Sequence, residues 1–317
     1  MPKFAVKNIF KLAPVVKLGI IALAVLILLV GWSYLFEIKI QPSAQLAQLI
    51  AKPAENNTTA DQSIAQTLTT QVIPENGYTV NVNWGDVGQK LVAAGGIDLE
   101  KYQENYGDEK YQLLLTYLTS DNNKSITINK ETAYFWVNTL WALGLTQRSD
   151  VLDKGVMGTE YRDRLGNFAS TGGWTLGAKD AVALYSSANI IPLTADQQSM
   201  VDRIAQNIYR PCCGNPTSFP DCNHGMAVLG LIELMVSQGY GEADIYQAAL
   251  AFNSYWFSQT YIDLAYYFQT KENTAWADVD PKRALSAEFS SAQGYQRVKK
   301  EIGTIPGTKP AGASCGT

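Results

Sequence analysis

Three of the four cysteines and the only histidine of this 317-residue chain lie within 13 residues of one another. They are Cys212, Cys213, Cys222 and His224, and Met226 follows two positions later. Thiolate and imidazole groups are preferred ligands of zinc, copper and iron centres, and a thioether favours Cu(I). The segment therefore predicts a transition-metal site for which these five residues are the candidate ligands.

The same cysteines are also compatible with structural disulfides, because thiols outside the cytoplasm are commonly oxidised. Cys222 would then pair with Cys212 or Cys213, and closing that loop would contribute roughly 2–3 kcal/mol. The remaining cysteine would pair with Cys315, the fourth cysteine of the chain. In this interpretation the loop is only a stabilising element.

Redox or nucleophilic chemistry is the third interpretation of the segment. Cys222 immediately precedes a predicted helix, whose positive N-terminal end favours a thiolate. His224 would act as a base or pair with that thiolate, and Cys212 or Cys213 would serve as the resolving thiol. The residues leave all three interpretations open.

Few other catalytic motifs are compatible with this composition. With one histidine in the chain, a Ser/His/Asp triad could only be built around His224, and the zinc motif H-E-x-x-H is excluded. The pairs Gly95-Gly96 and Gly172-Gly173 lack the lysine and the glycine spacing of phosphate-binding loops. No motif specifies a reaction.

Two predicted helices flank the Cys/His loop and would hold it in place. Thr194 and Gln197 form a capping-box pattern that starts a helix running to about residue 209. The second helix, 226–237, is apolar on nearly every face except Glu233. Three prolines and two glycines between them favour tight turns over continued helix. A rigid loop of this kind is a good support for a site.

Residues 18–36 form the one long apolar run, 19 residues without a charge. A helix of that length matches the ~30 Å hydrocarbon core of a bilayer. Four lysines precede it within residues 1–17, so the positive-inside rule places a basic tail in the cytoplasm and the rest outside. We therefore expect a single-pass anchor in the cell membrane. A cleaved signal peptide is the alternative, but no suitable cleavage site follows closely.

Composition divides the remainder into three parts. Residues 37–76 are polar and predict a stalk or linker, 77–302 carry the apolar residues of a folded domain, and 303–317 form a Gly/Pro-rich flexible tail. Beyond the basic tail the chain holds 21 basic and 29 acidic side chains. This acidic balance argues against binding to nucleic acid.

The domain has mainly helical periodicity, so we expect a mainly α fold, an irregular extracytoplasmic helical domain after the transmembrane helix. Two short segments, 78–82 and 125–128, alternate like strands. Five tryptophans recur through the domain, and core packing explains them best. The predicted helices are 84–94, a segment capped by Asp98, 109–118, 132–145, 194–209, 226–237, 241–253, 255–270 and 283–301.

The functional expectation is a membrane-anchored extracytoplasmic protein whose Cys/His loop binds copper, zinc or iron or is redox-active. The alternative is a binding or scaffold protein of the cell envelope, in which the cysteines form disulfides and the aromatic-rich surface contacts a protein partner.

Overall fold

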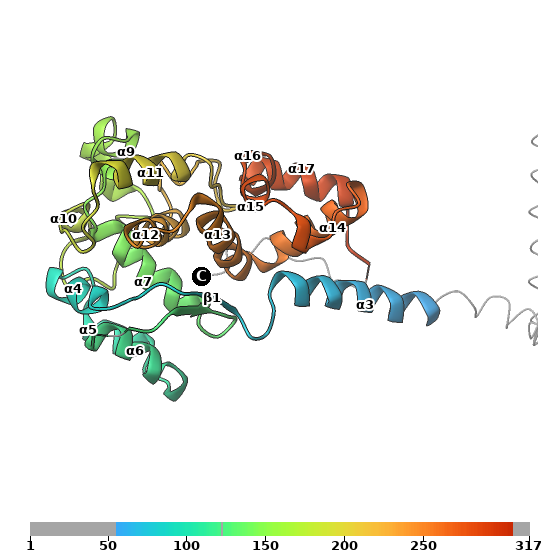
Figure 1. Ribbon diagram of the computed structural model, residues 1–317, viewed down its shortest axis with the longest axis horizontal. Helices are drawn as coiled ribbons and strands as arrows, with labels where there is room; N and C mark the ends of the chain where they lie inside the picture. The colour runs from blue at the N-terminus through green and yellow to red at the C-terminus, as the bar shows by residue number, and fades with distance from the viewer. Residues whose placement is uncertain (1–54, 122, 307–317) are drawn as a thin grey trace, which may run out of the picture. The chain divides into compact units, whose positions relative to one another are not determined.

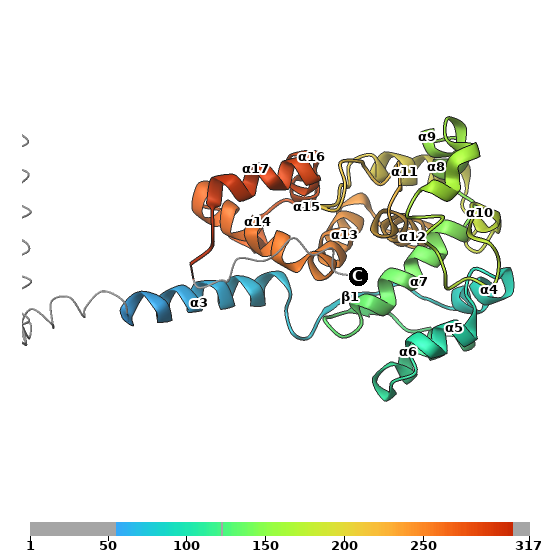
Figure 2. The same cartoon turned by 180° about the vertical axis from the view of Figure 1, so that it is seen from behind.

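The computed structural model describes residues 55–121 and 123–306 (Figures 1 and 2). These residues form a mainly helical structure with one small sheet, which confirms the predicted α class. The predicted anchor at 18–36, its basic tail and Cys315 lie outside the described residues. Within the described ranges, no helix combines the length and the apolar character needed to cross a membrane.

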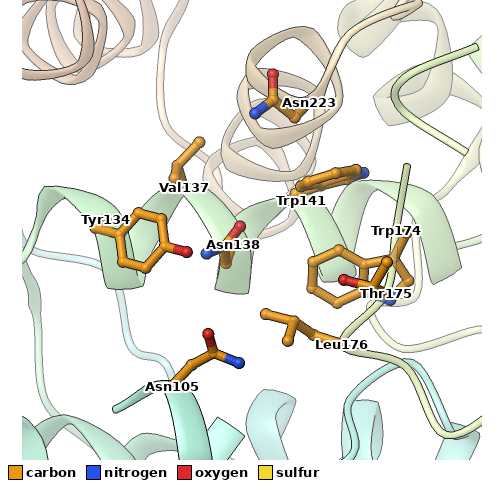
Figure 3. A pocket seen from close by; sticks show the side chains of 9 residues that line it. All are labelled: Asn105, Tyr134, Val137, Asn138, Trp141, Trp174, Thr175, Leu176 and Asn223. Atoms are coloured by element: carbon orange, nitrogen blue, oxygen red, sulfur yellow. The ribbon is translucent and has the colours of Figure 1, made fainter. Parts of the chain in front are cut away.

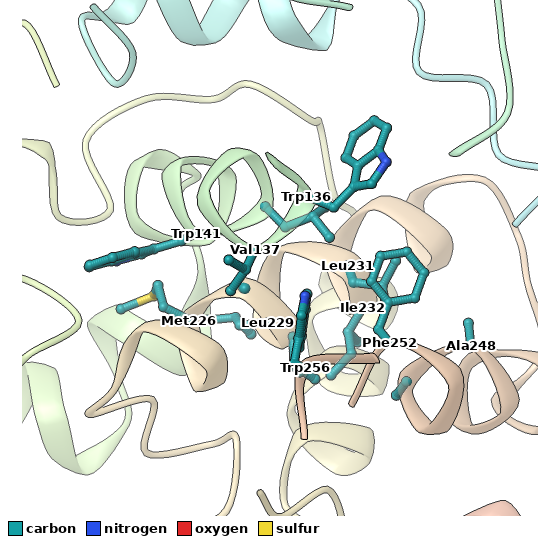
Figure 4. Packing of buried hydrophobic residues seen from close by; sticks show 14 of the residues in the cluster. Trp136, Val137, Trp141, Met226, Leu229, Leu231, Ile232, Ala248, Phe252 and Trp256 are labelled. Carbon is teal, nitrogen blue, oxygen red and sulfur yellow. The ribbon is translucent and has the colours of Figure 1, made fainter. Parts of the chain in front are cut away.

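Three helices form the centre of the fold. Figures 1 and 2 show α7 (Ala133–Thr146) beside α12 (Asn223–Ser237), with α13 (Glu242–Trp256) packed against both. Both α7 and α12 are buried over nearly their whole length, as their all-round apolar sequences predict. Figure 4 shows side chains from all three helices meeting in one core: Trp136, Val137, Trp141, Met226, Leu229, Leu231, Ile232, Ala248, Phe252 and Trp256.

Two glycines let α7 and α12 approach closely. A Cβ atom on Gly144 would lie 2.1 Å from the carbonyl oxygen of Met226, and one on Gly230 would lie 2.5 Å from that of Leu140. Real side chains do not approach backbone at these distances. The contact between the two central helices therefore depends on the absence of a side chain at both positions.

The elements before α7 lie on one side of this centre. The predicted strands pair antiparallel, with Thr79 opposite Thr127. Asp98 caps its helix as expected, accepting the backbone N–H groups of Glu100 and Lys101. The elements are α3 (Glu55–Val72), β1 (Tyr78–Val80), α4 (Val87–Ala94), α5 (Leu99–Asn105), the 3-10 helix Glu109–Tyr111, α6 (Gln112–Thr119) and β2 (Ile126–Ile128).

The predicted stalk 37–76 contains more structure than its polar composition indicates. The helix α3 spans 18 residues of it, and Leu68, Val72 and Ile73 are buried in the core. The hydroxyl of Tyr255 donates to the carbonyl oxygen of Pro74 at 2.6 Å. Widely spaced apolar residues on one helical face are sufficient for docking, although the average composition of the segment is polar.

Between α7 and α12 the chain forms short helices and loops. The capping box of Thr194 and Gln197 is present with both of its hydrogen bonds. Its helix ends at Ala205, earlier than predicted, and Tyr209 instead forms a bridge with Pro216. The elements are α8 (Asp150–Asp153), α9 (Val156–Thr159), the 3-10 helix Arg162–Asn167, α10 (Ala181–Leu184) and α11 (Ala195–Ala205).

The predicted helix 283–301 is broken into three pieces. Ser286 and Ser291 both have extended backbones, and the Ser291 side chain caps the last piece by accepting the N–H of Gly294. Serine side chains compete with helical hydrogen bonds in this way. The elements after α13 are α14 (Ser258–Lys271), the 3-10 helix Trp276–Asp278, α15 (Pro281–Ala284), α16 (Ala287–Ser290) and α17 (Ala292–Ile302).

Core packing of the tryptophans is confirmed. Four of the five that recur through the domain are buried, and Trp276 is half-buried against the same core. Ile305, at the start of the predicted tail, is also buried.

A carboxylic acid lies inside this core. Glu233 on α12 is fully buried, and neither of its oxygens has a hydrogen-bond partner among the described residues. Burial raises the pKa of Glu233 well above its ordinary value of 4.5. The folded protein therefore holds this side chain as the neutral acid.

The glycine contact predicts that Gly230→Ala destabilises the protein by about 2 kcal/mol or more, because the added methyl group forces α7 and α12 apart. Urea unfolding measures the difference. Gly166→Ala is the control, since its Cβ would meet only a Val182 methyl group at 3.5 Å. Equal costs for the two variants would contradict the close-contact explanation.

The buried acid predicts a specific pH dependence of stability. Above about pH 4.5 Glu233 ionises in the unfolded state but stays protonated in the folded state. The unfolded state then binds fewer protons, so stability falls by about 1.4 kcal/mol per pH unit up to the folded pKa. Glu233→Gln and Glu233→Met should both remove this slope in urea unfolding between pH 5 and 8. Variants that keep the wild-type slope would refute the prediction.

Candidate metal centre

The loop between α11 and α12 folds back on itself around Cys212 and Cys213. Tyr209 and Pro216 form an antiparallel bridge. The backbone N–H and the hydroxyl of Thr217 both donate to the carbonyl oxygen of Ile208, at 2.8 and 2.9 Å. Phe219 N–H donates to Pro216, closing a turn at the proline-rich end. The prolines thus produce the tight turns that the sequence predicts.

Contacts with other parts of the fold hold this loop in position. The N–H of Tyr209 donates to the carbonyl oxygen of Leu285 at 2.8 Å, and the N–H of Ala292, the first residue of α17, donates to that of Cys213 at 2.9 Å. On the other side, Ser170 N–H donates to the carbonyl oxygen of Asp221. The loop is therefore fixed by segments both before and after it in the chain.

The three loop cysteines converge on one point. The sulfur atoms of Cys212, Cys213 and Cys222 all lie within 4.8 Å of one another, and those of Cys212 and Cys222 are 3.4 Å apart. With a zinc–sulfur bond of ~2.3 Å, tetrahedral ligands lie about 3.8 Å apart and trigonal ligands about 4.0 Å apart. The cluster could therefore hold a metal ion with small side-chain adjustments.

A fully buried arginine, Arg210, contacts the thiol cluster. Arg210 donates from Nε to the sulfur of Cys222 at 3.2 Å and from one terminal nitrogen to the carboxylate of Asp221 at 2.7 Å. Its guanidinium also donates to the carbonyl oxygens of Asn215 and Phe219. One side chain thus joins the beginning, middle and end of the loop.

The close fit of this guanidinium explains a glycine in the sequence. A Cβ atom on Gly225 would lie 2.5 Å from the central carbon of the Arg210 guanidinium. Any larger residue at position 225 would force the Arg210 guanidinium to shift. The sequence between Cys222 and Met226 is therefore constrained by packing as well as by its chemistry.

Cys222 occupies the N-cap position of α12. Its sulfur accepts the N–H of Gly225 at 3.3 Å in addition to the Arg210 donor. Hydrogen bonds from the Cys212 and Cys213 thiols, together with the charge of Arg210, hold the pKa of Cys222 well below its ordinary value. Hydrogen bonding with Cys213 and Cys222 raises the pKa of Cys212. Among the three thiols, Cys222 therefore carries the negative charge most readily.

His224 does not join the thiol cluster. The group of side chains that could hold a metal ion consists of Cys212, Cys213 and Cys222, without His224. Its ring contacts Phe257 at 4.4 Å and Trp256 at 5.6 Å between centroids. Burial lowers the pKa of His224 to about 4, so the imidazole is neutral. It has no hydrogen bond to a thiol in the described part of the chain, where Arg210 is the cation beside Cys222.

Met226 lies in the core between α7 and α12 rather than with the thiols (Figure 4). It is fully buried. Of the five candidate ligands in the sequence, the structure thus brings three together, and His224 and Met226 pack among apolar side chains.

Sequence reasoning missed Arg210 as a site residue. The available signal was a single basic residue next to the Pro-Cys-Cys segment, in a loop without another cation. Asp221 binds Arg210 and accepts a hydrogen bond from the Asn215 side chain at 2.8 Å. The sequence did not indicate that the arginine would be buried.

The buried position of Arg210 predicts that even Arg210→Lys is strongly destabilising, by about 3–5 kcal/mol. A lysine lacks the planar fork and leaves the Cys222 sulfur, the Asp221 carboxylate or the loop carbonyls unpaired. Arg203→Lys is the matched control, because Arg203 pairs with Glu242 at an exposed site and should lose less than about 1 kcal/mol. Urea unfolding compares the two, and similar losses would contradict the role of Arg210.

No protein-family model, no curated protein and no solved structure matches the chain. The functional conclusion therefore depends on the geometry of the three thiols and of Arg210.

Proposed function

We propose that this chain is a membrane-anchored extracytoplasmic protein whose Cys212, Cys213 and Cys222 thiolates bind a soft transition-metal ion. The observation that carries the proposal is the convergence of three sulfur atoms within 4.8 Å of one another. Sulfur ligands favour zinc and Cu(I) over magnesium, calcium and manganese. The location is supported by the apolar run 18–36 and the four lysines before it.

Charge balance favours zinc over copper. Three thiolates, the Asp221 carboxylate and the Arg210 guanidinium carry a net charge of −3, which Zn²⁺ reduces to −1 and Cu⁺ only to −2. A buried site is most stable when its charges compensate one another. The N–H groups of Gly225 and Arg210 that point at the Cys222 sulfur are the kind of outer contacts that orient a ligand and tune its metal. Iron is less suitable, since iron–sulfur clusters use four protein ligands.

Three protein ligands leave one position open on a tetrahedral ion. Structural zinc sites are usually closed by four protein ligands, whereas sites that bind water or substrate keep a position free. The described residues supply three thiols. We infer that a zinc ion here exposes its fourth position to solvent or to an external ligand.

The alternative is a cell-envelope binding or scaffold protein in which the cysteines are oxidised. A specific distance supports it, because the sulfurs of Cys212 and Cys222 are 3.4 Å apart and side-chain rotation would bring them to the ~2.05 Å of a disulfide. Such a bond would remove two of the three ligands. The two functions are therefore mutually exclusive at this site.

The metal proposal predicts about one zinc ion per chain in full-length protein purified from its native membrane without chelators. Elemental analysis measures it. Cys212→Ser, Cys213→Ser and Cys222→Ser should each lower the zinc content several-fold, because three ligands cannot be reduced to two without large loss of affinity. Cys315→Ser is the control and should keep the wild-type zinc content.

The oxidation state of the thiols separates the two functions. Alkylation of the unfolded protein without reductant, followed by mass spectrometry, should find Cys212 and Cys222 modified. A metal-free protein with a Cys212–Cys222 disulfide would eliminate the metal proposal and support the scaffold alternative. Stoichiometric copper instead of zinc would keep the thiolate site but overturn the charge argument.

A further inference from the structure

A pocket lies beside the thiol loop, at the start of α12. It has a volume of about 210 Å³ and is formed by four residues of α7 (Tyr134, Val137, Asn138 and Trp141), by Asn105 at the end of α5, by the Trp174 loop and by Asn223. Figure 3 shows the three asparagine carboxamides and the Tyr134 ring around the pocket, with both indoles on one side. Asn223 directly follows Cys222, but its side chain lines this pocket.

The two tryptophans present fixed aromatic surfaces. Their rings meet in an edge-to-face arrangement at 4.8 Å between centroids. Both indole N–H groups are occupied within the fold: Trp141 donates to the carbonyl oxygen of Ser170 at 2.7 Å and Trp174 to that of Gly96 at 3.0 Å. The rings are therefore held in place, and they offer a ligand their carbon surface rather than a hydrogen-bond donor.

Asn138 places an unpaired polar atom in the pocket. The side chain is 6% exposed, and its amide nitrogen donates to the hydroxyl of Tyr106 at 2.6 Å. Its carboxamide oxygen has no hydrogen-bond partner among the described residues. This oxygen is therefore available to accept a hydrogen bond from a ligand or water in the pocket. The Tyr106 contact fixes which way the amide points.

The other two carboxamides also keep unused groups. The Asn105 amide nitrogen donates to the carbonyl oxygen of Lys101 at 2.9 Å, which leaves its oxygen available. The Asn223 oxygen accepts the N–H of His224 at 2.9 Å, which leaves its amide nitrogen available. The pocket thus combines acceptors and a donor with apolar ring surfaces, and no acidic or basic side chain lines it.

We propose that this pocket binds one ring of a neutral saccharide. A pyranose has apolar C–H faces that pack on indole rings and hydroxyl groups that both donate to and accept from carboxamides. The absence of charge in the lining disfavours nucleotides, acidic sugars and amino acids, whose ionic groups would be desolvated without a partner. The volume is below the ~300–1,000 Å³ of pockets for drug-sized ligands, which suits a single ring.

Ligand-observed saturation-transfer NMR tests this proposal on the full-length protein, in a detergent without a sugar headgroup. The probes are glucose, galactose, mannose, N-acetylglucosamine and their disaccharides, each at up to 10 mM. At least one should bind with a dissociation constant on the order of 1 mM, as expected for a small neutral ligand. Adenosine and phenylalanine test the nucleoside and amino-acid classes.

Two exposed positions provide the variants. Tyr134→Ala and Asn105→Ala should each weaken saccharide binding at least fivefold, because each removes part of the pocket without disturbing the core. Gln103→Ala, on the same helix as Asn105 but outside the pocket lining, should bind as the wild type does. No saccharide signal, a signal unchanged in both variants, or stronger binding of adenosine or phenylalanine would overturn the proposal.

This test is independent of the metal centre. The Cys222→Ser variant, if it remains folded, should keep its saccharide affinity, since none of the thiols lines the pocket. Loss of zinc from the thiols would then leave this inference intact, and loss of saccharide binding in the pocket variants would leave the zinc content unchanged.

Discussion

The buried charge of Arg210 is the interaction on which the thiol site depends. A guanidinium without solvent must be surrounded by acceptors, and here the Cys222 sulfur, the Asp221 carboxylate and two loop carbonyls supply them. Satisfying the cation fixes the path of the whole loop. The same contact places the positive charge of Arg210 beside the Cys222 sulfur and favours its thiolate form. One side chain therefore both stabilises the loop and promotes ionisation of Cys222.

The close contact of α7 and α12 positions everything around that loop. Because glycines at 144 and 230 allow the two helices to approach, the first turn of α12 lies close to Gly144, near the C-terminal end of α7. Cys222 caps the N-terminus of α12 and lies with the Cys212 and Cys213 thiols, while Asn223 and Trp141 both line the pocket. Hydrogen bonds from Trp141 to Ser170 and from Ser170 to Asp221 connect the wall of the pocket with the end of the thiol loop. Two chemically different sites thus share one rigid support.

The fold follows the sequence where a signal is local. The capping box at Thr194, the cap at Asp98 and the apolar helices correspond to short-range hydrogen bonds and to one helical period, so a single segment contains the information. The secondary-structure prediction is less accurate where contacts between residues far apart in the sequence determine the structure. The polar segment before β1 forms a helix that docks through a few apolar side chains, and the last predicted helix breaks at serines that favour their own hydrogen bonds.

Residue types and their spacing were sufficient to predict the helical class, the clustering of three thiols between two helices and the tight turns of the loop that carries them. These properties arise from residue type and spacing within a short stretch of chain. Three features depend instead on how distant segments pack together: Arg210, rather than His224, lies beside Cys222, Met226 belongs to the core, and residues from four separate segments enclose a pocket. Burial depends on which surfaces meet across the fold, and spacing along one segment does not specify that.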